Sequence, residues 1–81
     1  MNDTASFRRI DSARNMARFY ILSLQPTLFG AIALERHWGR IGTRGRHASR
    51  LFDTAEEAAA ALNAQVKRRV RRGYAQTDGS R

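Results

Sequence analysis

The pattern of apolar positions first predicts a strand from Ala17 to Gln25. Tyr20, Leu22 and Leu24 share one face, and Phe19, Ile21 and Ser23 share the other, so both faces carry apolar side chains. Because both faces are apolar, the pattern predicts a central position in a sheet. Pro26 should end this strand, because proline has no N–H to donate to a neighbouring strand.

The following stretch predicts a second strand from Leu28 to Ile41, antiparallel to the first. Its first half, Leu28–Leu34, is apolar and expected to be largely buried, whereas its second half is basic. Every second residue of a strand points to the same face, and one such set is Leu28, Gly30, Ile32, Leu34, Arg36, Trp38 and Arg40. The last three of these should therefore share one face, provided that no bulge intervenes. A turn with two glycines, Gly42–Gly45, then leads to a third strand, Arg46–Phe52.

The two ends of the chain give weaker patterns. Phe7–Ile10 is predicted to form a short edge strand, although its apolar residues do not alternate strictly, and Asp11–Asn15 has the composition of a turn. Residues 1–6 are expected to form a disordered tail, and residues 76–81 are expected to fray. The folded domain should therefore span residues 7–75.

Thr54–Glu57 predicts the start of a helix, because the Thr54 hydroxyl can accept a bond from the backbone of Glu57 while the Glu57 side chain reaches back. The helix is expected to run to about Arg72 and to stop at Gly73, with Tyr74 folding back. Its inward stripe is predicted to comprise Ala55, Ala58, Ala59, Leu62, Val66 and Val70. These elements predict an α+β fold: a single antiparallel β-sheet of about four strands, with one C-terminal α-helix packed on one face.

The composition argues for one small non-enzymatic domain. A chain of 81 residues buries only about three-fifths of its unfolded-chain surface. It has no cysteine, and His37 and His47 match no metal-ligand spacing, so no metal or cofactor is expected. The sequence shows no Ser-His-Asp or Cys-His set for catalysis. The start of the chain lacks the apolar core of a signal peptide, and the longest apolar run is too short to span a bilayer, so a cytoplasmic protein is expected. We also expect a monomer.

A formal net charge of +8 suggests an anionic partner. Lys67 is the one lysine, so fourteen of the fifteen basic residues are arginine. A GC-rich genome would also enrich arginine, so the position of the charge is more informative than its type. One cluster comprises Arg36, Arg40, Arg44, Arg46 and Arg50, and no acid occurs between residues 36 and 52. A solvated face is the alternative explanation for such a run.

A second cluster, Lys67–Arg72, lies at the end of the predicted helix. Cations there can simply stabilise the helix dipole. However, the cluster contains like-charge pairs four residues apart, which repel in an isolated helix. Capping needs one or two cations, so the excess favours an anionic ligand.

Trp38, Gly39 and Arg40 combine three groups suited to nucleic acid. The indole can stack on a sugar or base, and the guanidinium can grip a phosphate with two donors. Gly39 would leave the backbone open to a ligand. The alternatives are that Trp38 belongs to the core and that Gly39 forms a β-bulge.

Trp38-Gly39-Arg40, with Ile41-Gly42 and Gly45 behind them, resembles the WGR domain, the module named for these residues in poly(ADP-ribose) polymerases. The resemblance extends from about Phe7 to Ala75. It includes Phe19–Leu22, Leu28–Gly30, Phe52, Glu56–Ala58, Lys67 and Gly73–Tyr74. It implies a stand-alone bacterial module, because the family includes such short proteins and no catalytic domain accompanies this one.

In the polymerases the domain contacts DNA near a strand break, so the resemblance implies binding to the DNA backbone at duplex ends or nicks, with association to the nucleoid. The expected contacts are Arg36, Trp38, Gly39, Arg40, Arg44, Arg46, Lys67, Arg68, Arg71 and Arg72. RNA or single-stranded DNA is a variant of this function. The alternative is a protein-interaction adaptor in which Trp38 anchors the interface. A membrane partner is not expected, because the inward stripe is mostly alanine and is needed for the core.

Overall fold

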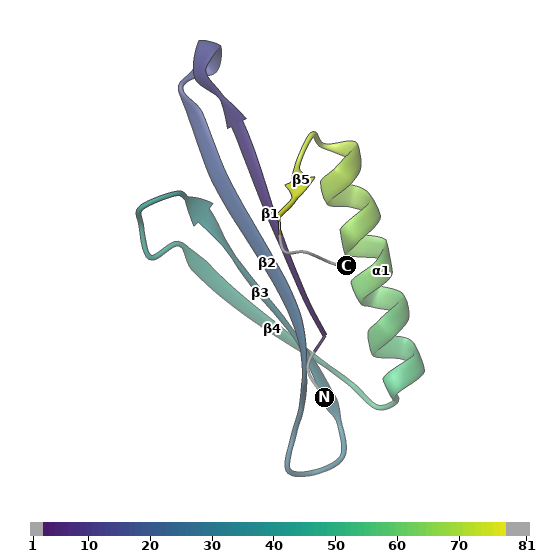
Figure 1. The fold of residues 1–81 in the computed structure, drawn as a ribbon. Helices are drawn as coiled ribbons and strands as arrows, with labels where there is room; N and C mark the ends of the chain where they lie inside the picture. Colours follow the sequence, from purple (N-terminus) through teal and green to yellow (C-terminus); the bar gives the residue numbers. More distant parts are fainter. Residues whose placement is uncertain (1–2, 78–81) are drawn as a thin grey trace.

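A computed structural model describes residues 3–77 of the chain as one antiparallel sheet with a helix against one face (Figure 1). The strands are β1 (Asp3–Asp11), β2 (Met16–Pro26), β3 (Ile32–Arg40), β4 (Arg46–Phe52) and β5 (Ala75–Gln76). A 3₁₀ turn, η1 (Ser12–Arg14), joins β1 to β2, and the helix α1 (Ala55–Arg71) follows β4. The sheet order is β4-β3-β2-β1-β5, and every neighbouring pair is antiparallel. The predicted α+β class is confirmed, with five strands instead of four.

The core lies between α1 and the central strand β2. The buried residues of β2 are Tyr20, Leu22 and Leu24, the predicted apolar parity, and they alternate with partly exposed residues. Leu22 is 0% exposed, and Phe7 on the neighbouring β1 is 1% exposed. Leu34 of β3 and Ala58 of α1 complete the contact between sheet and helix. The predicted central position of β2 is therefore correct.

The N-terminal strand is longer than predicted. β1 pairs with β2 from Asp3↔Leu24 to Asp11↔Met16. The expected tail is therefore wrong for residues 3–6, whereas residues 1 and 2 lie outside the described residues. Ala5 and Phe7 alternate into the core, while Thr4 and Ser6 belong to the opposite face of the sheet. The small side chain of Ala5 hid this alternation in the sequence.

The C-terminal segment also adds a strand. β5 pairs with β1 through Phe7↔Gln76 and Arg8↔Ala75, and the Thr77 N–H donates to the Ser6 carbonyl at 2.8 Å. The expected fraying is therefore wrong for Gln76 and Thr77, and residues 78–81 lie outside the described residues. Because β5 covers part of β1, the predicted edge position of Phe7 is also wrong.

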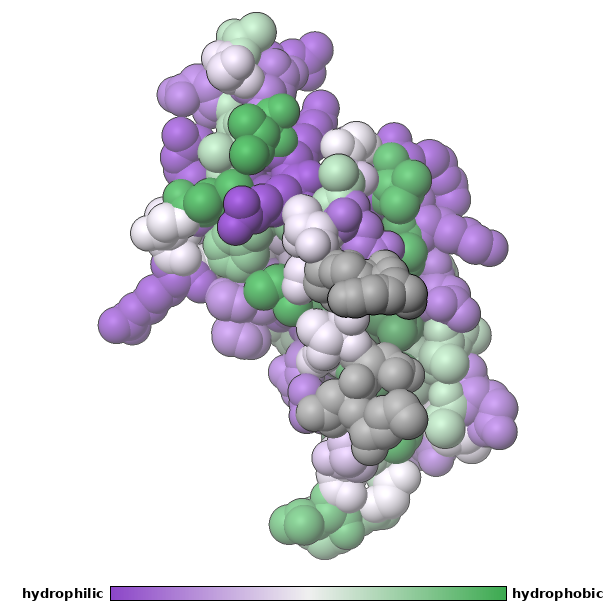
Figure 2. Space-filling view, in the orientation of Figure 1, coloured by the Kyte–Doolittle hydropathy of each residue, from purple (hydrophilic) through white to green (hydrophobic). Residues whose placement is uncertain are grey.

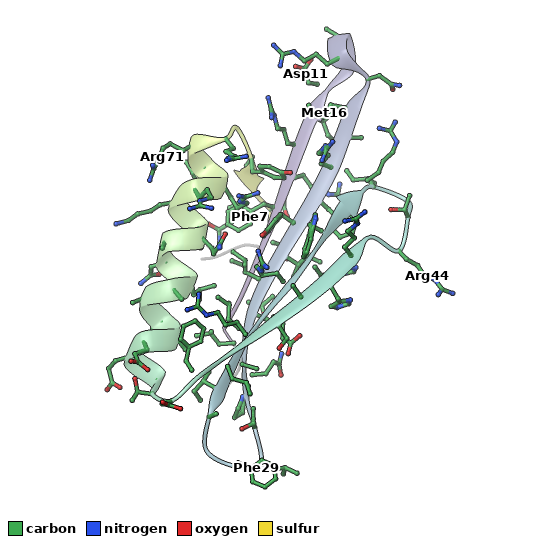
Figure 3. The ribbon with its side chains drawn as sticks, turned by 180° about the vertical axis from the view of Figure 1, so that it is seen from behind. Phe7, Asp11, Met16, Phe29, Arg44 and Arg71 are labelled. Atoms are coloured by element: carbon green, nitrogen blue, oxygen red, sulfur yellow. The ribbon has the colours of Figure 1, made fainter. Side chains whose placement is uncertain are left out.

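The β2–β3 connection differs most from expectation. β3 begins at Ile32, and the preceding residues form a loop in which the Thr27 N–H and hydroxyl both donate to the Ala31 carbonyl, at 3.0 and 2.8 Å. Leu28 and Phe29 are 96% and 94% exposed, instead of lying in a buried strand. Figure 2 shows a hydrophobic surface at the end of the sheet where this loop lies, and Figure 3 shows Phe29 at the tip of the loop. A strand starting at Leu28 would leave Thr27 alone to reverse the chain, and the shortest common hairpin loops need two residues.

The helix begins and ends as predicted. The Glu57 N–H donates to the Thr54 hydroxyl at 3.1 Å. At the C-terminus, Gly73 has φ +92°, its N–H donates to the Val70 carbonyl, and the Tyr74 N–H donates to the Arg69 carbonyl, both at 3.0 Å. This pattern is a Schellman motif, and its left-handed residue favours glycine. It turns Tyr74 back toward the core, as expected.

The inward stripe of α1 is partly different from the prediction. Ala58, Ala61, Leu62 and Val66 pack on the core. Ala55 and Ala59 are exposed, and Val70 is 56% exposed. After Leu62 and Val66, a 3.6-residue period brings Arg69 to the sheet one position before Val70.

Among residues 3–77, the structure contains no helix with the length and apolar character of a membrane span.

Candidate nucleic-acid interface

The face of the sheet that packs on α1 changes from apolar to basic along β2 and β3. The cross-strand pairs run in the order Leu24↔Leu34, Leu22↔Arg36, Tyr20↔Trp38 and Arg18↔Arg40. Directly opposed residues share one face of an antiparallel pair. The register therefore confirms that Arg36, Trp38 and Arg40 share one face, and it is the face that carries the core.

A hollow of about 500 Å³ lies on this face, beside the C-terminal end of α1. Figure 1 shows the β1–β2 hairpin continuing past that end of the helix, which leaves this part of the sheet uncovered. Five arginines from four elements line the hollow: Arg9, Arg18, Arg36, Arg69 and Arg72. The other lining residues are Met16, Tyr20, Trp38 and Tyr74. We call this site the arginine hollow.

The aromatic rings of the arginine hollow pack on one another and support two of the arginines. Tyr20 stacks on Trp38, with ring centroids 5.9 Å apart and 23° between the planes, and contacts Tyr74 edge to face at 6.1 Å. The Arg69 guanidinium lies 4.2 Å from the Tyr20 ring centroid, and the Arg36 guanidinium 5.3 Å from that of Trp38. Such stacking restrains each guanidinium and leaves donors at its edge for a ligand.

Among the described residues, no acidic side chain forms an ion pair with the arginines that line the arginine hollow. Within residues 3–77, the ion pair is Arg14–Asp11, at 3.6 Å, near the β1–β2 turn. Glu35 lies on the opposite face of the sheet, where the Ser49 hydroxyl donates to it at 2.9 Å. In addition, the Arg69 Nε is buried without a hydrogen-bond partner among the described residues. A bound anion would satisfy that donor and relieve the repulsion among the arginines.

Three of the seven acidic residues lie at the other end of α1. Glu56 and Glu57 occupy its first turn, and Asp53 precedes it. The helix α1 therefore has a basic C-terminal end and an acidic N-terminal end. An approaching polyanion would be attracted to the first end and repelled by the second.

The structure brings three of the ten predicted contact residues into the arginine hollow: Arg36, Trp38 and Arg72. Arg40 instead reaches the β1–β2 turn, where it donates to the Asn15 carbonyl at 3.1 Å and to its Oδ1 at 3.4 Å. Figure 3 shows Arg44 at the outer end of the β3–β4 turn and Arg71 on the side of α1 away from the sheet. The others outside the hollow are Gly39, Arg46, Lys67 and Arg68.

Gly39 has a structural role that the sequence did not suggest. It pairs with Phe19 in the unbroken register of β2 and β3, so it does not form the bulge considered above. A Cβ on Gly39 would lie 2.7 Å from the Gly45 Cα and 3.5 Å from the Phe19 ring. The open side of Gly39 is therefore occupied by the returning chain, which explains two of the glycines in this hairpin.

Trp38 lies between the core and the arginine hollow. It is half-buried and packs against the core cluster while lining the hollow. The core interpretation of Trp38 is therefore partly correct, and its role as a nucleic-acid contact stays a prediction. One part of the indole stabilises the fold, and the remainder faces the site.

Three residues that line the arginine hollow are absent from the predicted contacts, although the apolar stripes of the sequence point to them. Arg18 has the parity of the core residue Tyr20, and Arg9 has the parity of Phe7. Arg69 continues the inward helical period, although it was noticed only as a member of the Lys67–Arg72 cluster. Extending each apolar stripe by one more position would have identified all three arginines.

Comparisons with known proteins agree with this fold. The WGR domain family model matches residues 3–81. The uncharacterized protein y4dW of Sinorhizobium fredii is 44% identical over 66 residues, which are 82% of this chain and 32% of that protein. A crystal structure of a Bacteroides fragilis protein matches with a TM-score of 0.74 at 21% identity, covering 94% of this chain and 20% of that one. The chain thus spans a third or less of each relative, and the structural match concerns the fold alone.

Proposed function

The chain belongs to the WGR domain family, and from this premise we propose that the arginine hollow binds the DNA backbone at a duplex end, nick or other break. In the poly(ADP-ribose) polymerases this domain is a nucleic-acid-binding module. The observation that carries the proposal is the convergence of five arginines and three aromatic rings on one open hollow. Arginine pairs with phosphate through two parallel hydrogen bonds, and aromatic rings stack on sugars and bases.

The half-buried position of Trp38 favours an end over continuous duplex. Inside a duplex, each base is stacked on both sides and cannot reach a ring within a hollow. A terminal nucleotide exposes one base face and one sugar, which the free part of the indole can meet. The surrounding arginines would then hold the last phosphates.

The same side chains support binding instead of catalysis. The charged groups that line the arginine hollow are arginines, which keep their protons in proteins and so cannot act as general acids or bases. Among the described residues, no group of three His, Cys, Asp or Glu side chains could hold a metal ion. We therefore propose a binding role without a reaction.

Replacement of Trp38 tests the end preference. Trp38→Ala should weaken binding to an open-ended duplex by about 1–3 kcal/mol, the effect of losing one stacked base or sugar. Binding to the same duplex closed at both ends by hairpin loops should change less. Fluorescence anisotropy with the two DNAs measures this difference. Equal losses on both DNAs would contradict a terminal contact.

The same variant needs a stability control, because Trp38 also stacks on Tyr20. Loss of that stack should lower the melting temperature moderately, since an aromatic pair contributes about 0.5–1.5 kcal/mol beyond its buried area. Thermal melting of the sample used for binding provides the control. An unfolded variant would assign Trp38 mainly to the core.

Arg69 and Arg71 offer a matched pair of helix cations. Arg69→Ala should weaken DNA binding by about tenfold or more, because hydrogen bonds to charged groups contribute about 1.5–3 kcal/mol. Arg71→Ala should weaken it by less than about fivefold, as expected of an exposed charge outside the hollow. Titrations of both variants at one salt concentration compare them. Equal losses would show that general attraction, instead of the arginine hollow, provides the affinity.

Binding to a partner protein is a second candidate function, favoured by the exposed tip of the β2–β3 loop. Leu28 and Phe29 lie there, at the opposite end of the sheet from the β1–β2 turn (Figure 3). Phe29, instead of Trp38, would then be the anchor. DNA titration of Phe29→Ser separates the two functions. An unchanged affinity for DNA would show that the loop tip does not contact DNA and is available to a partner protein. A lost affinity would assign the loop tip to the nucleic-acid interface.

A further inference from the structure

A second, smaller hollow adjoins the arginine hollow. Its volume is about 160 Å³, and it lies between α1 and the two strands β3 and β4. Its lining residues are Leu34, Arg36, Arg50, Phe52, Ala61 and Gln65. Arg36 lines both hollows, so the two sites meet at this side chain.

The second hollow repeats the chemistry of the first. The Arg50 guanidinium lies 5.0 Å from the Phe52 ring centroid, just as Arg36 lies over Trp38 at 5.3 Å. Arg36 pairs with Ala48 across the strands, so Arg50, two residues further along β4, is the diagonal neighbour of Arg36 on the same face. The backbone positions of such diagonal neighbours are roughly 7–8 Å apart. A guanidinium that lies over a ring can offer its other side to a nucleobase. The two hollows thus present successive arginine–aromatic pairs along one face.

Gln65 adds a polar group that the fold does not use. Its Oε1 is buried and has no hydrogen-bond partner among the described residues. An unpaired buried acceptor is destabilising unless a ligand donates to it. The N–H groups on the Watson–Crick edge of an unpaired base are suitable donors, whereas a phosphate has only acceptors at neutral pH.

We propose that the second hollow binds the first unpaired nucleotide of a single-stranded overhang next to the duplex end held at Trp38. This inference rests on the proposed function of the arginine hollow. The base would stack on Arg50 and donate to Gln65, while Arg36 would contact the phosphate between the two sites. Beyond Phe52 the surface becomes acidic, with Asp53 and Glu57 near the start of α1. The site therefore accommodates one or two unpaired nucleotides.

Anisotropy titrations with one duplex in several forms test the proposal. The forms are a blunt end, 5′ or 3′ overhangs of one, two and four nucleotides, and an abasic overhang. One overhang polarity should bind about tenfold more tightly than the blunt end, the effect of one stacked base. The gain should be complete at two nucleotides and absent from the abasic overhang. Equal affinities for blunt and overhanging duplexes would overturn the proposal.

Variants connect the gain to the second hollow. Arg50→Ala and Gln65→Ala should each reduce the ratio of overhang to blunt affinity toward one. Arg8→Ala is the matched control for charge, because Arg8 is exposed and pairs with Phe19 on the opposite face of the sheet. It should leave the ratio unchanged. Thermal melting checks that each variant is folded.

The outcomes also separate this proposal from the proposed function. A folded protein that binds blunt duplex, but gains nothing from an overhang, would overturn the second hollow alone. An overhang gain that survives in both Arg50→Ala and Gln65→Ala would also overturn it. No binding to any of these DNAs at low salt would overturn both proposals.

Discussion

A fourfold rise in salt concentration, from about 50 to about 200 mM, should weaken binding to duplex DNA by roughly 500-fold. Each phosphate that a basic side chain neutralises releases counterions, with a slope of about −0.9 in a plot of log affinity against log salt. The arginine hollow contains five arginines, so five contacts would give a slope of about −4.5. Anisotropy titrations at four or more salt concentrations measure this slope.

Neutralising variants provide the control for the salt effect. Arg72→Ala should reduce the steepness of the slope by about one contact, whereas Arg8→Ala should leave it nearly unchanged. A slope well beyond −4.5 would mean that exposed cations outside the arginine hollow, such as Arg46 and Lys67, also contact phosphates. A slope near zero, or no binding at low salt, would contradict the nucleic-acid function and leave the protein partner as the better candidate.

Phe7→Ala should destabilise the domain by about 3–5 kcal/mol, because it removes a fully buried aromatic ring and leaves a cavity. Small domains have about 5 kcal/mol of stability in total, so the variant should be largely unfolded. Phe29→Ala removes the same atoms from a loop tip, where surface substitutions usually change stability by less than about 0.5 kcal/mol. Urea unfolding of both variants, followed by circular dichroism, gives the two values.

The comparison of the two phenylalanines tests the N-terminal strand and the β2–β3 loop together. Phe7 is 1% exposed and Phe29 is 94% exposed. A large loss of stability for Phe29→Ala would mean that the loop packs on the domain and that β3 begins earlier. A small loss for Phe7→Ala would remove β1 from the core and support the shorter domain expected from the sequence.

The elements predicted well are those with local causes. The alternation of Tyr20, Leu22 and Leu24 needs only the two-residue repeat of a strand. Thr54 and Gly73 delimit α1 because the groups that satisfy its terminal N–H and carbonyl groups lie within a few residues. The same is true of β4, which lies between a turn with two glycines and the helix cap. Local periodicity therefore established the α+β class and most of the strand order.

The candidate site was only partly predictable for the same reason. Arg36, Trp38 and Arg72 were proposed as contacts from their local setting, and they do line the arginine hollow. Arg9, Arg18 and Arg69 each continue an apolar stripe, but they come from three different elements, and no local pattern shows that these stripes meet at one site. Their convergence depends on the β1–β2 register and on the rotation of α1.

The sequence by itself therefore determined the α+β class, the strands β2 and β4, the limits of α1, the basic character and the family. Only the tertiary structure decided which apolar residues are buried and which basic residues come together in the arginine hollow. Phe7 and Phe29 have the same hydrophobicity, yet one is covered by Tyr20, Tyr74 and α1 and the other extends into solvent. Burial and electrostatic potential at a point sum contributions from chain segments distant in sequence, so they arise only when β-strand pairing and helix packing bring those segments together.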